Sequence, residues 1–176
     1  MYEVEVKFPA DHGRLRRRLD ELDAVHEATV EQRDTYYDAP HRSFAETDEA
    51  LRIRRVRRDG TTDARIAYKG PLVDEASKTR EEVETGVEDG ETMAAVLDRL
   101  GFSAVATVEK RRAVYALDGY AVVLDAVEGL GEFVEVERES ADVAATREGA
   151  FDLCRELGLD PDDQIRASYL ELLLGE

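Results

Sequence analysis

Charged and apolar residues alternate along several stretches of the chain, and this alternation predicts β-strands. Near the N-terminus, Glu3, Glu5 and Lys7 fall on one face of an extended segment, and the residues between them are apolar. The same alternation returns around residues 52–54 and 134–137. Several strands would therefore each carry one charged face and one apolar face.

Eight strands and four helices account for most of the pattern. Strands are predicted over residues 2–8, 26–37, 50–58, 64–70, 79–86, 104–117, 120–128 and 132–139. Helices are predicted over residues 11–22, 91–100 and 142–157, and a short one is predicted from a Ser168 cap through Leu174. The polar connection that begins at Gly70-Pro71 is expected to be a mobile loop at one end of the sheet.

The charged strand faces indicate how the sheet is arranged. An open sheet could leave all of them in water, whereas a closed sheet with its charges inward would form a tunnel lined with acids and bases. The apolar faces, which include Val4, Ile53 and Val83, would then point outward and need cover from the three longer helices. We therefore predict an α+β fold, in which a closed barrel with a charged interior has helices packed outside.

Length and composition narrow the class of protein. The 176 residues suffice for one domain, 1–176, and show no linker. No apolar run approaches the roughly 20 residues of a membrane span, and the first strand leaves no room for a signal peptide, so we expect a cytoplasmic protein with no membrane partner. Cys154 is the single cysteine and lies in an apolar helical stripe, which excludes a disulfide framework and predicts a core position.

The charge balance is strongly acidic. The chain has 41 Asp and Glu against 24 Lys and Arg, a net charge of −17, and the acids are spread throughout. This composition resembles that of cytoplasmic proteins from salt-loving microbes, so we predict that the fold depends on concentrated salt. Because no basic face survives the acid excess, a nucleic-acid partner is not expected.

Lysine is rare and its placement is informative. Of the four lysines, Lys7, Lys69 and Lys110 lie in strand patterns that also carry other charges, although the chain elsewhere uses arginine. A compact ammonium is suited to act as a point charge on phosphate or as a tunable proton donor.

A tunnel that buries acids beside bases needs a reason, because unpaired buried charges are costly. One interpretation is mutual neutralisation without a ligand. The other is that the bases hold a polyanion and the acids hold a divalent cation that accompanies it, since Mg²⁺ takes carboxylate and phosphate oxygens together. Arg52, Arg54 and Arg112 suit bidentate phosphate contacts. The three histidines show no metal-ligand spacing, and no glycine-rich phosphate loop is present.

The motifs together resemble the CYTH, or triphosphate tunnel metalloenzyme, superfamily, whose hallmark is Glu-x-Glu-x-Lys in the first strand. The resemblance covers essentially the whole chain. It is carried by Glu3-x-Glu5-x-Lys7, Asp34–Asp38, Ala50–Arg54, Tyr68–Pro71, Arg80-x-Glu82-x-Glu84, Lys110-x-Arg112, Asp125–Gly131, Phe133–Glu137 and Ser168–Leu173.

What the resemblance implies is an eight-stranded antiparallel tunnel that binds a triphosphate such as ATP with Mg²⁺ or Mn²⁺. It implies metal ligands at Glu3, Glu5, Glu82, Glu84, Asp125, Glu135 and Glu137. It implies phosphate-binding residues at Lys7, Arg52, Arg54, Lys69, Arg80, Lys110 and Arg112, and we expect catalytic roles for Lys69 and Glu5.

The segments Asp125–Gly131 and Ser168–Leu173 look most like the class IV adenylate cyclase branch of the superfamily. The first hypothesis is therefore a cyclase that converts ATP to cyclic AMP and pyrophosphate. The second is an inorganic, nucleoside or thiamine triphosphatase, and the third is a non-catalytic module that binds a triphosphate. A homodimer is also considered.

Overall fold

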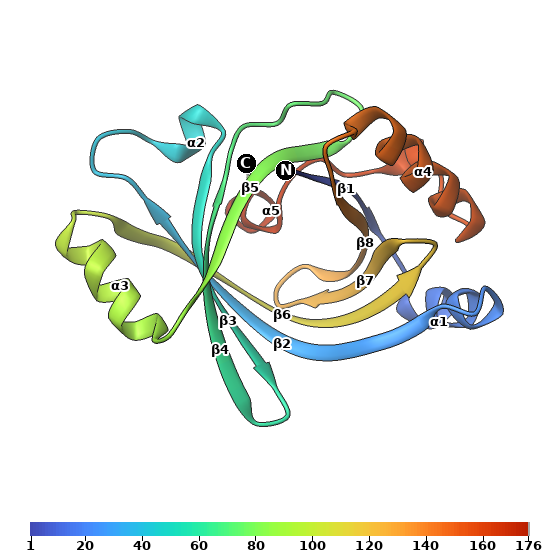
Figure 1. Ribbon diagram of the computed structural model, residues 1–176, viewed down its shortest axis with the longest axis horizontal. Helices are drawn as coiled ribbons and strands as arrows, with labels where there is room; N and C mark the ends of the chain where they lie inside the picture. The colour runs from blue at the N-terminus through green and yellow to red at the C-terminus, as the bar shows by residue number, and fades with distance from the viewer. Residues whose placement is uncertain (176) are drawn as a thin grey trace.

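Eight antiparallel strands close on themselves to form a barrel, which confirms the predicted fold (Figure 1). The computed structural model describes residues 1–175. The strands are β1 (Tyr2–Pro9), β2 (Val25–Asp38), β3 (Ala50–Arg58), β4 (Thr61–Lys69), β5 (Lys78–Val87), β6 (Ser103–Leu117), β7 (Tyr120–Val127) and β8 (Gly131–Ser140). Their order around the barrel is β1-β5-β4-β3-β2-β6-β7-β8, and β1 pairs with β8 to close the ring.

The helices lie outside the barrel or at its end. They are α1 (His12–Glu21), α2 (Phe44–Thr47), α3 (Gly90–Arg99), α4 (Val143–Glu156), the 3₁₀ turn η1 (Pro161–Asp163) and α5 (Tyr169–Leu174). Figure 1 shows α1 and α4 together on one side of the barrel and α3 on the opposite side. The short α2 lies in a segment that was predicted as loop. None of the helices in the described part of the chain is long and apolar enough to cross a membrane.

The helices α1, α3, α4 and α5 begin within one residue of their predicted positions, because an acid or a hydroxyl precedes each of them. Asp11 accepts a hydrogen bond from the backbone N–H of Arg14, and Asp89 and Asp142 cap α3 and α4 in the same way. Ser168 and Glu171 form a reciprocal capping box at α5.

The apolar core lies between the outer barrel wall and the helices. On the side of α1 and α4, residues such as Val6, Val134 and Val136 are fully buried against Leu19 and Cys154. A second cluster joins Ile53 to α3 through Leu97. The prediction that apolar strand faces point outward and are covered by helices is therefore confirmed for these clusters, and Cys154 is a core residue as expected.

Two expectations about the barrel wall are wrong. Val83 on β5 was expected under a helix but is 59% exposed, because α3 packs on β3 and β4 instead. The interior is also not charged throughout. Val108, Val127 and Phe133 pair across strands with inward-facing Asp34, Lys110 and Asp125, so one sector of the inner wall is apolar.

Contacts hold the connection between β4 and β5, residues 70–77, at one end of the barrel. Arg147 of α4 donates to the Asp74 carboxylate at 2.8 Å, and Arg166 donates to the Asp74 carbonyl at 2.6 Å. Gln164 donates to the carbonyl of Ala76 at 2.7 Å. The segment was expected to be mobile, but these contacts fasten it to α4 and to the chain that leads into α5.

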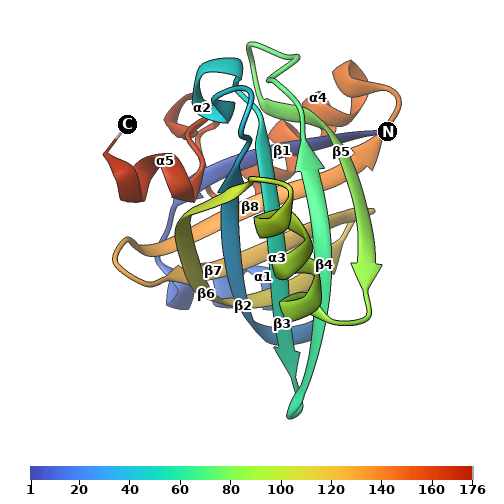
Figure 2. The same cartoon turned by 90° about the vertical axis from the view of Figure 1, so that its left-hand side faces the viewer.

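The same end of the barrel carries α2 and α5 (Figure 2). We call this end, bounded by α2, α5 and residues 70–77, the mouth. Arg80 of β5 joins two of its parts by donating to the backbone carbonyls of Asp48 and Gly70, both at 2.8 Å. The mouth is thus built by residues that are far apart in the sequence.

Gly149 tests how tightly α4 packs on the barrel. A Cβ at this position would lie 2.2 Å from the Tyr120 hydroxyl oxygen, which donates to the Thr146 carbonyl. Gly149→Ala should therefore lower the free energy of unfolding by about 1–3 kcal/mol, although the same change normally stabilises a helix. Chemical denaturation measures this, and Tyr120→Phe in the same background should recover part of the loss. An increase in stability would show that α4 does not pack as described.

Candidate functional site

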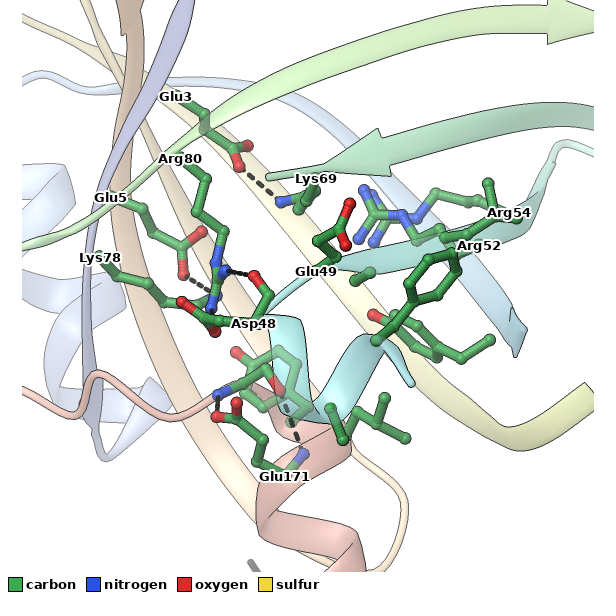
Figure 3. Close-up of a pocket in the computed structure, with 18 of the residues that line it drawn as sticks. Glu3, Glu5, Asp48, Glu49, Arg52, Arg54, Lys69, Lys78, Arg80 and Glu171 are labelled. Carbon is green, nitrogen blue, oxygen red and sulfur yellow. Dashed lines mark hydrogen bonds and ion pairs between the residues drawn. The ribbon is translucent and has the colours of Figure 1, made fainter. Parts of the chain in front are cut away.

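The barrel interior and the mouth enclose one continuous cavity lined by charged side chains from every strand except β7 (Figure 3). Strand register explains this, because the charged residues at alternate positions all face inward. Figure 3 shows Glu3 and Lys69 pointing toward one another, with Arg52 and Arg54 on β3, the strand next to that of Lys69.

Three carboxylates converge at one point of the cavity. Glu3 and Glu5 of β1 and Glu137 of β8 each place an oxygen within 4.8 Å of the others. The register brings them together, since Glu5 lies directly opposite Glu137 in the β1–β8 ladder. Three carboxylates at this spacing are the ligands that Mg²⁺ and Mn²⁺ prefer.

Proton affinities support this assignment. Burial, with the nearby carboxylates of Glu3, Glu135 and Glu5 adding to it, raises the pKa of Glu137 to about 8, in spite of the Arg112 guanidinium. Burial and the Glu135 carboxylate also raise the pKa of Glu5. Burial disfavours the charge of Glu3 too, but the Lys69 ammonium outweighs it and lowers the pKa of Glu3. Glu5 and Glu137, whose charges are disfavoured by burial and by neighbouring carboxylates, would gain most from a divalent ion.

The other predicted metal ligands lie outside this cluster and, like Glu3 and Glu5, have cationic partners. Both Asp125 oxygens accept hydrogen bonds from Arg112, and Glu135 lies 3.4 Å from the same guanidinium. Glu82 contacts Arg52 at 3.6 Å and Lys69 at 3.7 Å. Glu84 accepts from Arg65 at 2.5 Å and is the most exposed member of the set. The geometry favours charge-pairing roles for these four acids.

Two bidentate ion pairs join neighbouring strands of the barrel. Arg54 donates through Nε and Nη2 to Asp34 at 2.7 and 2.8 Å, and Arg112 donates likewise to Asp125, at 2.7 Å for both bonds. Each pair joins directly opposed residues on neighbouring strands, β2 with β3 and β6 with β7. These pairs fix each guanidinium. Neither Nη1 group makes a hydrogen bond within the described residues, although that of Arg112 lies 3.9 Å from Glu137.

Arg52 has an unsatisfied donor in the cavity. Among the described residues its nearest carboxylate is Glu82 at 3.6 Å, and its buried Nε has no hydrogen-bond partner there. A buried N–H without a partner is costly, so this donor indicates an acceptor that the protein alone does not supply. A phosphate oxygen would satisfy it.

Two lysines are held by carboxylates. Lys69 donates to Glu3 at 2.5 Å, and although burial disfavours its charge, the Glu3 carboxylate outweighs burial and raises the pKa of Lys69. Lys78 donates to Glu5 at 3.0 Å. Both therefore remain ammonium ions at neutral pH.

Lys7 and Lys110 have a different environment. Lys7 donates to the Ala167 carbonyl at 3.1 Å and lies 3.8 Å from Glu5, while Lys110 lies 3.8 Å from Asp34. Burial and the neighbouring Arg112 and Arg54 lower the pKa of Lys110 to about 7. Its charge is thus the one that an added anion would stabilise most.

The guanidinium of Arg80 makes its hydrogen bonds to residues of the mouth. Besides its two carbonyl contacts it donates to the Asp48 carboxylate at 2.9 Å. The geometry favours a structural role, and its predicted phosphate contact stays a prediction.

Sequence reasoning did not assign three residues that belong to the site. Lys78 was passed over although it is the fourth of the rare lysines and faces inward beside Glu5. Asp34 was noted within a motif without a role, yet it binds Arg54 and lies near Arg52 and Lys110. Tyr169 was noted only in the C-terminal motif, and it donates to Asp125 at 2.8 Å. The rarity of lysine was a usable signal for Lys78.

An apolar surface adjoins the charged cavity at the mouth. It consists of Tyr36, Phe44, Val105, Leu170 and Leu174, which come from β2, α2, β6 and α5, and we call it the apolar shelf. Val105 and Leu174 are 52% and 46% exposed. Tyr36 lies opposite Arg52 in the β2–β3 ladder, so the shelf begins where the charged wall ends.

Comparison with known proteins agrees with this architecture. The CYTH domain family matches residues 1–169. "Putative adenylate cyclase MJ0240" of Methanocaldococcus jannaschii is 38% identical over an alignment of 176 positions, and the alignment covers 98% of each chain. "Adenylate cyclase CyaB" of Aeromonas hydrophila is 29% identical, with 97% of this chain and 88% of that protein covered. The solved structure of the PH1819 protein from Pyrococcus horikoshii OT3 is 40% identical, with 98% of each chain covered and a TM-score of 0.90.

The chain therefore belongs to the CYTH family. The family match spans almost all of the described residues, including every strand of the barrel.

Glu5→Gln tests the acidic cluster. We expect the concentration of Mn²⁺ needed for half-saturation to rise at least about tenfold, because a neutral amide replaces a charged ligand. The fold should persist, since the amide oxygen can still accept from Lys78. Calorimetric titration with Mn²⁺ measures the first effect and thermal unfolding the second. Glu81→Gln, on the exposed outer face of β5, is the matched control and should bind Mn²⁺ normally. Unchanged binding in Glu5→Gln would overturn the metal assignment.

The lowered pKa of Lys110 predicts that the protein takes up protons when it binds an anion. With a pKa of about 7, its side chain is mostly neutral at pH 8, and a bound polyanion raises that pKa and protonates it. Calorimetry with metal-free tripolyphosphate at pH 8, in buffers of different ionisation enthalpy, should show net proton uptake. Lys110→Arg, which stays charged, should reduce the uptake. Equal uptake by the two proteins would rule out Lys110 as its source.

Proposed function

We propose that this protein is a metal-dependent enzyme that acts on ATP as a class IV-type adenylate cyclase, forming cyclic AMP and pyrophosphate. The observation that carries the proposal is the cavity itself. A three-carboxylate cluster faces a wall of buried cations, one of which has an unsatisfied N–H donor, and an apolar shelf adjoins them. The names of the relatives in Methanocaldococcus jannaschii and Aeromonas hydrophila support the same activity.

The triphosphate would lie along the cation wall. Arg52 has the free donor, Arg54 and Arg112 keep one Nη group each, and Lys7 and Lys110 lack a close carboxylate. Glu3, Glu5 and Glu137 would hold Mg²⁺ or Mn²⁺, which when bound neutralises phosphate charge and orients the chain of phosphates. The charges on both sides are fixed before the substrate arrives, as electrostatic stabilisation requires.

The apolar shelf favours an organic triphosphate over an inorganic one. Inorganic triphosphate would fill only the charged part of the cavity and leave Val105 and Leu174 exposed to water. A nucleoside places a flat, largely apolar base and a ribose next to its α-phosphate. The base would therefore cover the shelf while the ribose stays beside Tyr36 and the charged wall.

In the reaction, the ribose 3′-oxygen forms a bond to the α-phosphorus, and the bond from that phosphorus to the bridging oxygen breaks. The pyrophosphate leaves with that oxygen, and the 3′-hydroxyl proton passes to solvent or a carboxylate. Lys69 stays protonated because of Glu3, so its role is to stabilise charge on the phosphates rather than to act as a base. Positioning and fixed charges supply most of the acceleration.

A product panel tests the proposal. The protein is incubated with ATP, GTP, thiamine triphosphate or tripolyphosphate, with Mg²⁺ or Mn²⁺, and the products are separated by chromatography. We expect cyclic AMP and pyrophosphate in equal amounts from ATP. ADP and phosphate, or hydrolysis of tripolyphosphate, would instead establish a triphosphatase. Tight ATP binding without any product would establish a binding module. Glu81→Gln serves as an active control, and Glu5→Gln as an inactive one.

Lys69→Arg tests how the ammonium acts. The compact group fits between Glu3 at 2.5 Å and Glu82 at 3.7 Å, and a planar guanidinium cannot keep both contacts in the same geometry. Turnover should fall about tenfold or more, which corresponds to ~1.4 kcal/mol in the barrier. Steady-state kinetics with ATP measure it. A Lys69→Arg protein as active as the parent would mean that charge alone suffices.

A further inference from the structure

The chain leading into α5 places a tyrosine beside the buried bases. Ile165 N–H donates to the Lys7 carbonyl at 2.7 Å, and the capping box of Ser168 and Glu171 fixes the first turn of α5. Tyr169, the first residue of that helix, is only 5% exposed. Its side chain therefore reaches into the barrel rather than covering its outside.

Two ammonium groups lie over the Tyr169 ring. The Lys7 Nζ is 3.9 Å from the ring centroid and the Lys110 Nζ is 4.9 Å from it. The two lysines come from β1 and β6, which are not neighbours in the barrel. An aromatic face attracts cations, so the ring is a contact that the two lysines share.

Both ends of the tyrosine side chain are fixed. Its hydroxyl donates to Asp125 Oδ2 at 2.8 Å, and that carboxylate is itself held by Arg112. The ring also meets the Phe133 ring edge-on, with the centroids 5.2 Å apart. The orientation of the ring is thus set by residues of β7 and β8.

An aromatic ring, unlike a carboxylate, can hold an ammonium group without cancelling its charge. Lys69 and Lys78 donate to Glu3 and Glu5 at 2.5 and 3.0 Å, so each of these ammonium groups already has a carboxylate partner. In the part of the chain that the structure describes, no carboxylate lies nearer than 3.8 Å to Lys7 or Lys110. The ring restrains each flexible stem without cancelling its charge, which leaves that charge available to an anion.

We propose that Tyr169 is a positioning residue that aims Lys7 and Lys110 at the phosphates of the substrate, so that this part of the site is complete only when the α5 segment is docked. The proposal rests on the proposed function, because it assigns these lysines to phosphate. Tyr169 itself acts through the two ammonium groups and need not touch the substrate.

Nuclear magnetic resonance tests the geometry without any substrate. The chain has four lysines, so labelling lysine with ¹³C at Cε gives a spectrum of few signals. The Hε protons of Lys7 and Lys110 should be shifted upfield by the ring current. Tyr169→Phe should keep the shift and Tyr169→Leu should abolish it, whereas normal shifts in the parent protein would overturn the proposal.

Tripolyphosphate binding tests whether Tyr169 controls how the two lysines bind phosphate. Tyr169→Phe should bind within about threefold of the parent and Tyr169→Leu at least about tenfold more weakly, with the fold of each checked by thermal unfolding. In a Lys110→Met background, Tyr169→Leu should cost clearly less than it does alone, since residues that act through one another are not additive. Equal costs in the two backgrounds would show a merely structural role and overturn the proposal.

The two proposals fail in different ways. If the parent protein makes cyclic AMP but the lysine protons show no ring-current shift, only the role of Tyr169 is wrong. If the shift is present but the parent binds neither tripolyphosphate nor ATP, the proposed function is wrong, and the phosphate-aiming role falls with it.

Discussion

Burying charge inside a closed sheet is the constraint on which the rest of this structure depends. A buried ion is costly unless it is paired, and the pairs here follow from strand register. Asp34 lies opposite Arg54, and Arg112 lies opposite Asp125. A slip of one residue in either ladder would turn one partner to the outside and leave the other unpaired in the interior. The same interactions therefore hold the barrel in register and hold the guanidinium groups in place for a ligand.

The balance of protons inside the cavity connects this constraint to function. Burial raises the pKa of Glu137 to about 8 and, despite the opposing Lys69 ammonium, that of Glu82 to about 7, so these acids retain part of their protons near neutral pH. The cavity is then more positive than its residue types suggest. A metal ion at the acidic cluster would displace protons, and the phosphates would balance the added charge. The helices serve stability separately, because their apolar faces pack on the outer wall.

The sequence predicts most of the fold, and it predicts the site unevenly. Alternation and turn residues predict every strand and the longer helices to within a few residues, because the two faces of a strand meet different environments. Val83 shows the limit, since a local pattern indicates which way a side chain points but not whether a helix covers it. The apolar sector around Val108 was missed although Val108 is in phase with Lys110 and Arg112, so the alternation alone already predicts that it faces inward. Among the predicted metal ligands, Glu3, Glu5 and Glu137 meet, whereas Asp125 is bound by Arg112, a pairing that depends on distances between strands. The salt dependence, the cytoplasmic location and the homodimer stay predictions.

A crystal structure with Mn²⁺ and a non-hydrolysable ATP analogue would locate both ligands, the metal by its anomalous scattering. We expect a manganese peak bounded by Glu3, Glu5 and Glu137. We also expect phosphate oxygens in contact with Arg52, Lys7 and Lys110, and the base on the apolar shelf. An analogue bound outside the barrel, or manganese held by other residues with the Arg52 Nε still unpaired, would overturn the proposed arrangement of metal and substrate.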